Sequence, residues 1–242
     1  MAERDVQTGA GVVLATLATG QFLMALDTSV MNVSIATVAT DVHTTVTGIQ
    51  TAITLYALVM ASLMITGGRI GQMIGRKRAF AVGAVIYGCG SFTTALAPNL
   101  AVLLLGWSLL EGVGAALILP AIVGLVASNF AESERPRAYG LIAAAMAAAV
   151  AVGPLLGGLL TTYASWRWVF GGEVVLVLVI LILSRRIQDQ VAEREPGFDG
   201  LGAALSAVAL ACIVLGILRA SAWGFIRPVP DGPSILGLSP TI

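Results

Sequence analysis

Long apolar runs separated by short polar segments dominate the pattern of this chain. A helix needs about 18 or more apolar residues to span a membrane. Stretches of about this length lie at 11–36, 48–67, 80–97, 100–127, 138–161, 169–184 and 201–220. No strand-like alternation or hairpin signal competes with them, so a membrane β-barrel is not indicated. The pattern predicts an all-α membrane protein with seven spans.

Composition supports the lipid bilayer as the surroundings of this chain. It is 57% hydrophobic and 11% charged, whereas a soluble domain is roughly 45–50% apolar and about 25% charged. The formal net charge of zero gives no reason to expect a nucleic-acid partner. The sequence has no metal-spaced His or Cys set and no H-E-x-x-H or G-x-S-x-G motif, so we expect no cofactor, no metal and no enzymatic activity.

The Lys and Arg residues fall unevenly on the two sides that these spans define. With the N-terminus in the cytoplasm, ten of the 13 cations lie inside and three lie outside. The inner cations are Arg4, Arg69, Arg76, Lys77, Arg78, Arg135, Arg137, Arg185, Arg186 and Arg194, and the outer ones are Arg167, Arg219 and Arg227. Because cytoplasmic loops carry an excess of Lys and Arg, we expect a multi-pass protein of the cell (plasma) membrane with a cytoplasmic N-terminus.

Three acids lie within the predicted spans. An ionisable group at membrane depth costs about 2.5–3.5 kcal/mol on insertion scales, so it usually faces the bundle interior and serves a function. Asp27 and Glu111 fall near the middle of their spans, and we interpret both as functional rather than as structural hydrogen-bonding groups. Glu173 falls near the outer end of its span, and we interpret it as structural.

A glycine-rich, cationic segment, GGRIGQMIGRKRAF (67–80), joins the second and third predicted spans. Its glycines permit a tight turn, and its cations can contact acids or helix C-termini on neighbouring cytoplasmic ends. The glycine spacing is not that of a phosphate-binding loop, and no strand precedes the segment. Part of the charge is a topology signal, and we expect the turn to act as a gate latch as well.

Small residues recur in the fifth predicted span, AAAMAAAVAVGPLLGGLL. They allow another helix to approach closely, and Pro154 removes a backbone donor and should kink the span. Two interpretations remain open: a tight helix pair alone, or a close-packed contact on which two bundles rock.

Three of these segments together resemble the major facilitator superfamily, specifically its branch of drug:proton antiporters with fourteen helices. LDTSVMNVSIATV resembles the first-helix motif of that branch, GGRIGQMIGRKR resembles its loop motif G-x-L-A-D-R-x-G-R-K, and AVAVGPLLGG resembles its antiporter motif G-x-x-x-G-P-x-x-G-G. LGWSLLEGVGAALILP is similar to the fourth-helix motif R-x-x-Q-G-x-G-A-A. The seventh span resembles the extra helix of this branch, so the resemblance covers nearly the whole chain.

The resemblance implies roles for the residues in these motifs. In the family, the acid of the loop motif helps to lock one conformation, and the Arg of the fourth-helix motif is tied to proton coupling. Here Gln72 replaces that acid, Ser108 replaces that Arg, and Glu111 replaces the Gln of the fourth-helix motif. We therefore assign proton coupling and substrate contact to Asp27, Glu111 and Asn32. The gating-loop residues are Gly68, Gly71, Gln72, Gly75, Arg76, Lys77 and Arg78, and the antiporter-motif residues are Gly153, Pro154, Gly157 and Gly158.

The implied fold is the six-helix N-terminal bundle of a major facilitator, built as a 3+3 inverted repeat, with a seventh linker helix. We place the bundle at 1–184, a cytoplasmic linker at 185–200, the seventh helix at 201–220 and an extracytoplasmic tail at 221–242. Seven helices that begin inside end outside, whereas both halves of such a transporter begin inside. We therefore expect a missing C-terminal half.

The implied function is proton-coupled efflux of amphipathic or cationic small molecules or drugs by an antiporter, of which this chain is the N-terminal half. Its partners are then a small-molecule substrate, protons, the lipid bilayer and the missing C-terminal half. The alternative is a truncated membrane protein that does not transport and acts as a scaffold or regulator, or is inactive.

The cation bias predicts that the turn at Gln72 faces the cytoplasm. We expect a single Cys at position 72, in a chain with Cys89 and Cys212 replaced, to react with a membrane-impermeant thiol reagent only after the inner face is exposed. A single Cys in the turn near Arg167 should react from outside and serves as the control. Labelling of position 72 from outside in intact cells would contradict this orientation.

Overall fold

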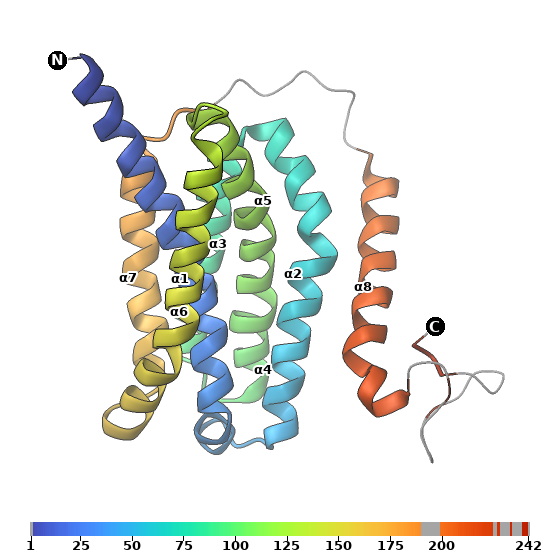
Figure 1. The fold of residues 1–242 in the computed structure, drawn as a ribbon. Coiled ribbons are helices and arrows are strands. Elements are labelled where there is room, and N and C mark those ends of the chain that lie inside the picture. Colours follow the sequence, from blue (N-terminus) through green and yellow to red (C-terminus); the bar gives the residue numbers. More distant parts are fainter. Residues whose placement is uncertain (1, 190–198, 225–226, 228–232, 234–238, 242) are drawn as a thin grey trace.

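The computed structural model describes residues 2–189, 199–224, 227, 233 and 239–241, and its regular structure there is helical. The elements are α1 (Ala2–Asp41), α2 (Val46–Ile74), α3 (Arg76–Ala95), α4 (Leu100–Leu103), the π-helix η1 (Leu104–Glu111), α5 (Gly112–Asn129), α6 (Arg135–Tyr163), α7 (Arg167–Ser184) and α8 (Gly200–Trp223). Because α4, η1 and α5 continue one another, the described residues form seven long helices (Figure 1). The all-α prediction is confirmed.

Six of the seven long helices are long and apolar enough to cross a membrane. The exception is α3, so the span predicted at 80–97 is present as a helix but is not among these candidates. Its buried face carries small and polar residues, including Gly88, Gly90, Ser91 and Thr94. These residues lower its hydropathy, and they also let α3 pack against both α5 and α7 inside the bundle.

The helix pairs that pack together follow the order expected of an internal repeat. Helix α1 packs on α6 and α7, while α5 packs on α2 and α3. The first triplet is α1, α2 and α3, and the second is the α4–η1–α5 helix, α6 and α7. If each helix is replaced by its counterpart in the other triplet, the α1–α6 pair becomes the α5–α2 pair. The same exchange converts the α1–α7 pair into the α5–α3 pair. The bundle α1–α7 therefore has the packing of two related triplets.

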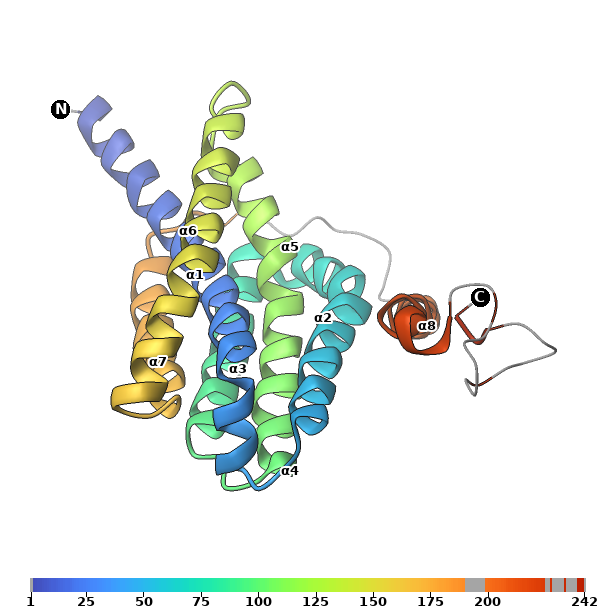
Figure 2. The ribbon, with the colours of Figure 1, turned by 60° about the horizontal axis from the view of Figure 1, so that its bottom comes forward.

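Helix α8 stands at the edge of the molecule and packs beside α2 (Figures 1 and 2). Only 6% of its most apolar window is buried, so α8 packs loosely on the rest of the described chain. It covers the predicted seventh helix at 201–220. Most of the linker predicted at 185–200 and most of the tail predicted at 221–242 lie outside the described residues.

Helix α2 crosses α5 in direct backbone contact at Gly67. A Cβ on Gly67 would overlap the carbonyl oxygen of Ala116 in α5, whereas a Cβ on Gly68 would lie 3.4 Å from Pro120, at ordinary van der Waals distance. The neighbouring glycines of the loop motif therefore have different structural demands, and only Gly67 is required by this helix crossing.

We predict that Gly67→Ala destabilises the folded chain by about 1–3 kcal/mol, because two backbones must separate to admit the methyl group. Gly68→Ala is the matched control, and it should leave stability within about 0.5 kcal/mol. Thermal unfolding of the purified protein in one detergent measures both. Equal shifts for the two variants would contradict the close crossing of α2 and α5.

Candidate functional site

A layer of buried polar groups separates two apolar clusters in the bundle. On α1, Leu17 and Leu23 belong to one cluster, Met31 and Val38 belong to the other, and Asp27 lies between them. The same order holds on the other elements of this layer: Glu111 lies between the clusters on η1–α5, Ser91 on α3 and Glu173 on α7. The fold therefore brings acids from three helices to one level.

Asp27 accepts two hydrogen bonds from a single indole. The Nε1–H of Trp107 lies 2.8 Å from one carboxylate oxygen and 2.9 Å from the other. The Trp107 ring stacks on Tyr56 of α2, with ring centroids 5.3 Å apart and planes inclined by 5°. Asp27 and Trp107 are completely buried. Stacking on Tyr56 thus holds the indole of Trp107 in place, and the indole N–H orients the carboxylate of Asp27.

Glu111 and Glu173 complete a cluster of three acids with Asp27. One carboxylate oxygen from each of the three lies within 4.8 Å of the others. Glu173 accepts a hydrogen bond of 3.0 Å from the Ser91 hydroxyl through one oxygen. Its other oxygen and both oxygens of Glu111 have no hydrogen-bond partner in the described part of the chain. No Lys or Arg is paired with any of the three acids among the bonds described.

The π-helix η1 places Trp107 and Glu111 in this layer. A π-helical segment within an α-helix is rare and occurs mostly at functional sites. Its residue Gly106 lies against Gly90 of α3, where a Cβ on Gly90 would stand 2.6 Å from the Cγ of Glu111. The absence of side chains at both glycines lets η1 approach α3 and carries Glu111 to the acids of α1 and α7.

Asn32 lies apart from the acids, on the exposed face of α1. Its amide donates to the Thr28 carbonyl at 2.8 Å. It lines an open cavity of about 420 Å³ between α1 and α6, together with Thr28, Ser29 and Pro154. Of the three residues assigned to coupling and substrate contact, the structure brings Asp27 and Glu111 together and leaves Asn32 on a separate surface.

The loop motif forms a tight junction between α2 and α3. Gly75 adopts φ 97°, a conformation that favours glycine. Arg76 donates to the Gly124 carbonyl of α5 at 3.0 Å, and Lys77 donates to the Arg185 carbonyl at the end of α7, also at 3.0 Å. The backbone N–H of Lys77 donates to the Asp189 carboxylate at 3.2 Å. The cations of the motif therefore tie α3 to the ends of α5 and α7 within the same bundle.

The remaining residues of the loop motif make no described hydrogen bond to another helix. Gln72 is exposed and accepts a hydrogen bond of 3.0 Å from Arg69, its neighbour on α2, and Arg78 is exposed. Gly68 and Gly71 line a small cavity of about 180 Å³ with Gln72. Gln72 thus occupies the position of the family's locking acid and contacts its own helix.

The antiporter motif forms the contact between α6 and α1. A Cβ on Gly153 would overlap the Ser29 side chain, and a Cβ on Gly157 would lie 3.2 Å from Val30. The Ser29 hydroxyl also donates to the Val150 carbonyl at 3.2 Å. Gly158 has open space around it. The expectation of a close helix approach therefore finds its partner helix in α1.

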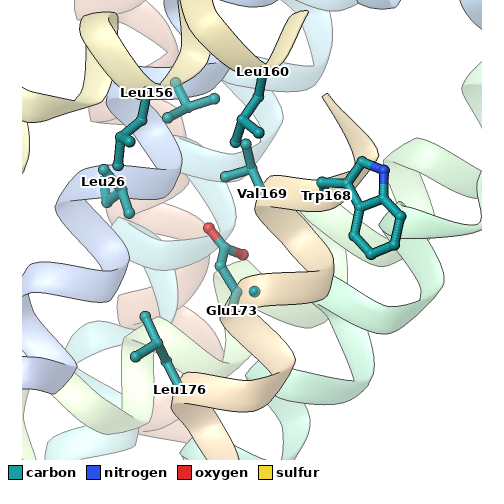
Figure 3. Close-up of a pocket in the computed structure, with 9 residues that line it drawn as sticks. Leu26, Leu156, Leu160, Trp168, Val169, Glu173 and Leu176 are labelled. Atoms are coloured by element: carbon teal, nitrogen blue, oxygen red, sulfur yellow. The ribbon is translucent and has the colours of Figure 1, made fainter. Parts of the chain in front are cut away.

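Glu173 also borders a cavity of about 260 Å³ between α1, α6 and α7. Figure 3 shows its carboxylate directed into the space that the side chains of Leu26 and Val169 share. Leu156 and Leu160 close the α6 side. The acid cluster consequently has one member that meets an apolar cavity.

Sequence reasoning missed several residues of this site. From its place near the end of its span Glu173 is expected to be structural, whereas the structure places it in the acid cluster. Trp107 and Tyr56 read as ordinary apolar span residues, although an indole N–H in a span needs an acceptor. Ser91 gave no signal, because the hydroxyls of many span residues bond their own helix.

The chain belongs to the Major Facilitator Superfamily, whose family model matches residues 17–237. This is a family of transporters rather than enzymes. The relatives it matches include drug-resistance and efflux proteins. The fold is that of solved family members: the peptide transporter POT in complex with sulfate superposes with a TM-score of 0.67 at 16% identity, over 86% of this chain and 45% of that one. The POT family transporter PepTSo gives 0.68 at 14% identity, over 90% and 48%.

Curated relatives are similar across most of this chain. The puromycin resistance protein pur8 of Streptomyces alboniger is 35% identical over 214 residues, which cover 87% of this chain and 42% of the relative. The tetracenomycin C resistance and export protein of Streptomyces glaucescens is 30% identical over 88% and 40%. The multidrug efflux pump LfrA of Mycolicibacterium smegmatis is 32% identical over 88% and 43%. The chain spans about half the length of the curated relatives it matches.

We predict that Trp107→Phe destabilises the folded chain by about 1–3 kcal/mol, because it keeps a ring on Tyr56 and leaves the buried Asp27 carboxylate without its donor. The loss should be smaller in the Asp27→Asn background, where no buried charge is left unpaired. Denaturant unfolding of the parent, both single variants and the double variant measures the coupling. Strictly additive losses would contradict a direct Trp107–Asp27 interaction.

Proposed function

We propose that this chain forms one half of a proton-coupled exporter of amphipathic or cationic small molecules. The observation that carries the proposal is the buried cluster of three acids with unpaired oxygens on Glu111. The similarity to resistance and efflux proteins supports the export of small molecules. The cation bias of the loops supports a cytoplasmic N-terminus in the cell membrane.

The electrostatics of the cluster favour a role in carrying protons. Charges within 4.8 Å repel each other strongly when water is excluded. Three buried carboxylates with no cation would be very costly, and carboxyl groups that share a site hold a proton between them. Repulsion among the three carboxylates therefore favours the uptake of a proton, and the oxygens of Glu111 have no other hydrogen-bond partner and can hold it.

The contacts divide the roles within the cluster. Asp27 accepts from the Trp107 N–H through both oxygens, an arrangement that suits an ionised carboxylate. Glu111 has no donor on either oxygen, an arrangement that suits a carboxyl group that gains and loses a proton. We assign the transported proton to Glu111, and the retained charge that attracts a cationic substrate to Asp27.

We assign the entry of the substrate to the exposed face of α1 and α6, which is separate from the buried Asp27, so contact between the substrate and Asp27 requires a second conformation. The cavity of about 420 Å³ beside Asn32 lies on this face. Its walls combine apolar side chains with Thr28, Ser29 and Asn32, as small-molecule sites commonly do. Alternating access requires that the substrate and the proton bias two conformations of the whole transporter differently. Because α1 and α6 are in close contact at Gly153, we expect the two helices to move together during this change.

We predict that Glu111→Gln in the full-length transporter abolishes accumulation of substrate against its gradient but still permits equilibrative exchange. The amide keeps the shape of the side chain and cannot release a proton. The measurement is substrate movement in proteoliposomes under an imposed pH gradient, where the accumulation ratio should fall to about one. Asp27→Asn should weaken the binding of cationic substrates about tenfold, or about 1.4 kcal/mol.

Glu134→Gln is the matched control, since Glu134 is an exposed acid in the turn before α6. It should leave accumulation unchanged. Accumulation by the Glu111→Gln protein that equals the parent level would show that Glu111 is a structural acid and that coupling resides elsewhere.

A further inference from the structure

Tyr87 of α3 brings a hydroxyl group without a hydrogen-bond partner to the acid cluster. Its side chain is completely buried, and the hydroxyl is unpaired in the described part of the chain. It lies beside the carboxyl groups of Asp27 and Glu111 without a hydrogen bond to either. We propose that the Tyr87 hydroxyl donates a hydrogen bond to Glu111 when Glu111 loses its proton, and that it thereby sets the proton affinity of the cluster.

Close packing of α3 on α5 holds Tyr87 at this position. A Cβ on Gly114 of α5 would stand 2.8 Å from the backbone nitrogen of Tyr87 and 2.9 Å from its Cβ. Gly114 follows Glu111 by three residues, so the two lie on neighbouring turns of one helix face. Ser91, one turn beyond Tyr87 on α3, donates to Glu173 at 3.0 Å. The same face of α3 therefore supplies one donor that is in use and one that is not.

Glu111 is the acid of the cluster that lacks a donor. Asp27 accepts from the Trp107 N–H through both oxygens, and Glu173 accepts through one oxygen from a hydroxyl. Neither oxygen of Glu111 has a partner in the described chain. A buried carboxylate that loses its proton needs such a donor, because an unpaired buried charge is costly. The bonds of the Glu111 side chain rotate, so its carboxyl group can turn toward the Tyr87 hydroxyl while the helix stays in place.

The groups around the hydroxyl determine what it can bind. The titratable side chains that face Tyr87 are Asp27 of α1, Tyr56 of α2, Glu111 of η1 and Glu173 of α7. No Lys or Arg is paired with the acids among the bonds described, so a neutral donor has to stabilise a newly ionised carboxylate. A hydrogen bond to an ionised group is about twice as strong as one between neutral groups. The inference rests on the proposed function, since it takes Glu111 as the group that exchanges the proton.

The test is a pH titration of this chain in lipid nanodiscs, followed by the infrared C=O stretch of protonated carboxyl groups. Tyr87→Phe keeps the ring and removes a hydroxyl that has no described partner, so the variant should fold as the parent does. Without the donor the ionised cluster is less stable and holds its proton more tightly. We expect the apparent proton affinity of the cluster to rise about tenfold or more, which moves the midpoint up by about one pH unit. An unchanged midpoint would overturn the proposal.

The Glu111→Gln background identifies the acid that the hydroxyl serves. The acids of a close cluster titrate together, so a midpoint belongs to the cluster, and the comparison of two backgrounds isolates the pair. In Glu111→Gln, the further change Tyr87→Phe should alter the proton affinity of the remaining acids less than about twofold. A tenfold change there would show that the hydroxyl serves Asp27 or Glu173, and it would refute the assignment to Glu111.

Tyr163→Phe is the matched control, since Tyr163 at the end of α6 is 82% exposed. It should leave the midpoint unchanged, and a shift equal to that of Tyr87→Phe would refute a local effect. The titration needs no transport, so it is separate from the test of coupling. Accumulation by Glu111→Gln at the parent level would refute proton coupling at Glu111 and leave the titration result standing. An unaltered titration in Tyr87→Phe would refute the role of Tyr87 alone.

Discussion

Glycine at positions 90 and 106 allows α3 and η1 to lie in direct backbone contact. A Cβ on Gly90 would stand 2.6 Å from the Cγ of Glu111, and a Cβ on Gly106 would stand 2.6 Å from the Thr94 hydroxyl. The acid cluster depends on this contact, because any side chain in the gap would separate η1 from α3 and withdraw Glu111. In a membrane, where lipid competes equally for apolar surface, such close packing is a main source of helix association.

The layer of buried polar groups lies between the two apolar clusters of the bundle. Trp107 belongs to one apolar cluster and donates a hydrogen bond to Asp27 in the layer. Tyr87 belongs to the other cluster, and its hydroxyl has no partner among the described residues. At the loop end, Arg76 and Lys77 hold α3 to α5 and α7. Helix α3, the η1–α5 helix and α7, which carry Ser91, Glu111 and Glu173, are therefore held together at this end as well as at the polar layer.

Much of the fold followed from sequence, and less of the site did. Apolar run lengths gave the helices, and three motifs gave the family. Asp27 and Glu111 stood out because ionisable groups in spans are rare. The position of Glu173 along α7 does not predict its neighbours, because the tilt and rotation of a helix in the membrane are set by packing against other helices. The role of Trp107 depends on a π-helical segment, which no local pattern in the sequence predicts.

The position of Glu111 in the acid cluster depends on the π-helical form of η1. A π turn holds about one residue more than an α turn, so rewinding η1 into an α-helix would rotate one flank against the other by about 100°. Trp107 and Glu111 lie within this segment. Such a rotation would turn Glu111 away from Asp27.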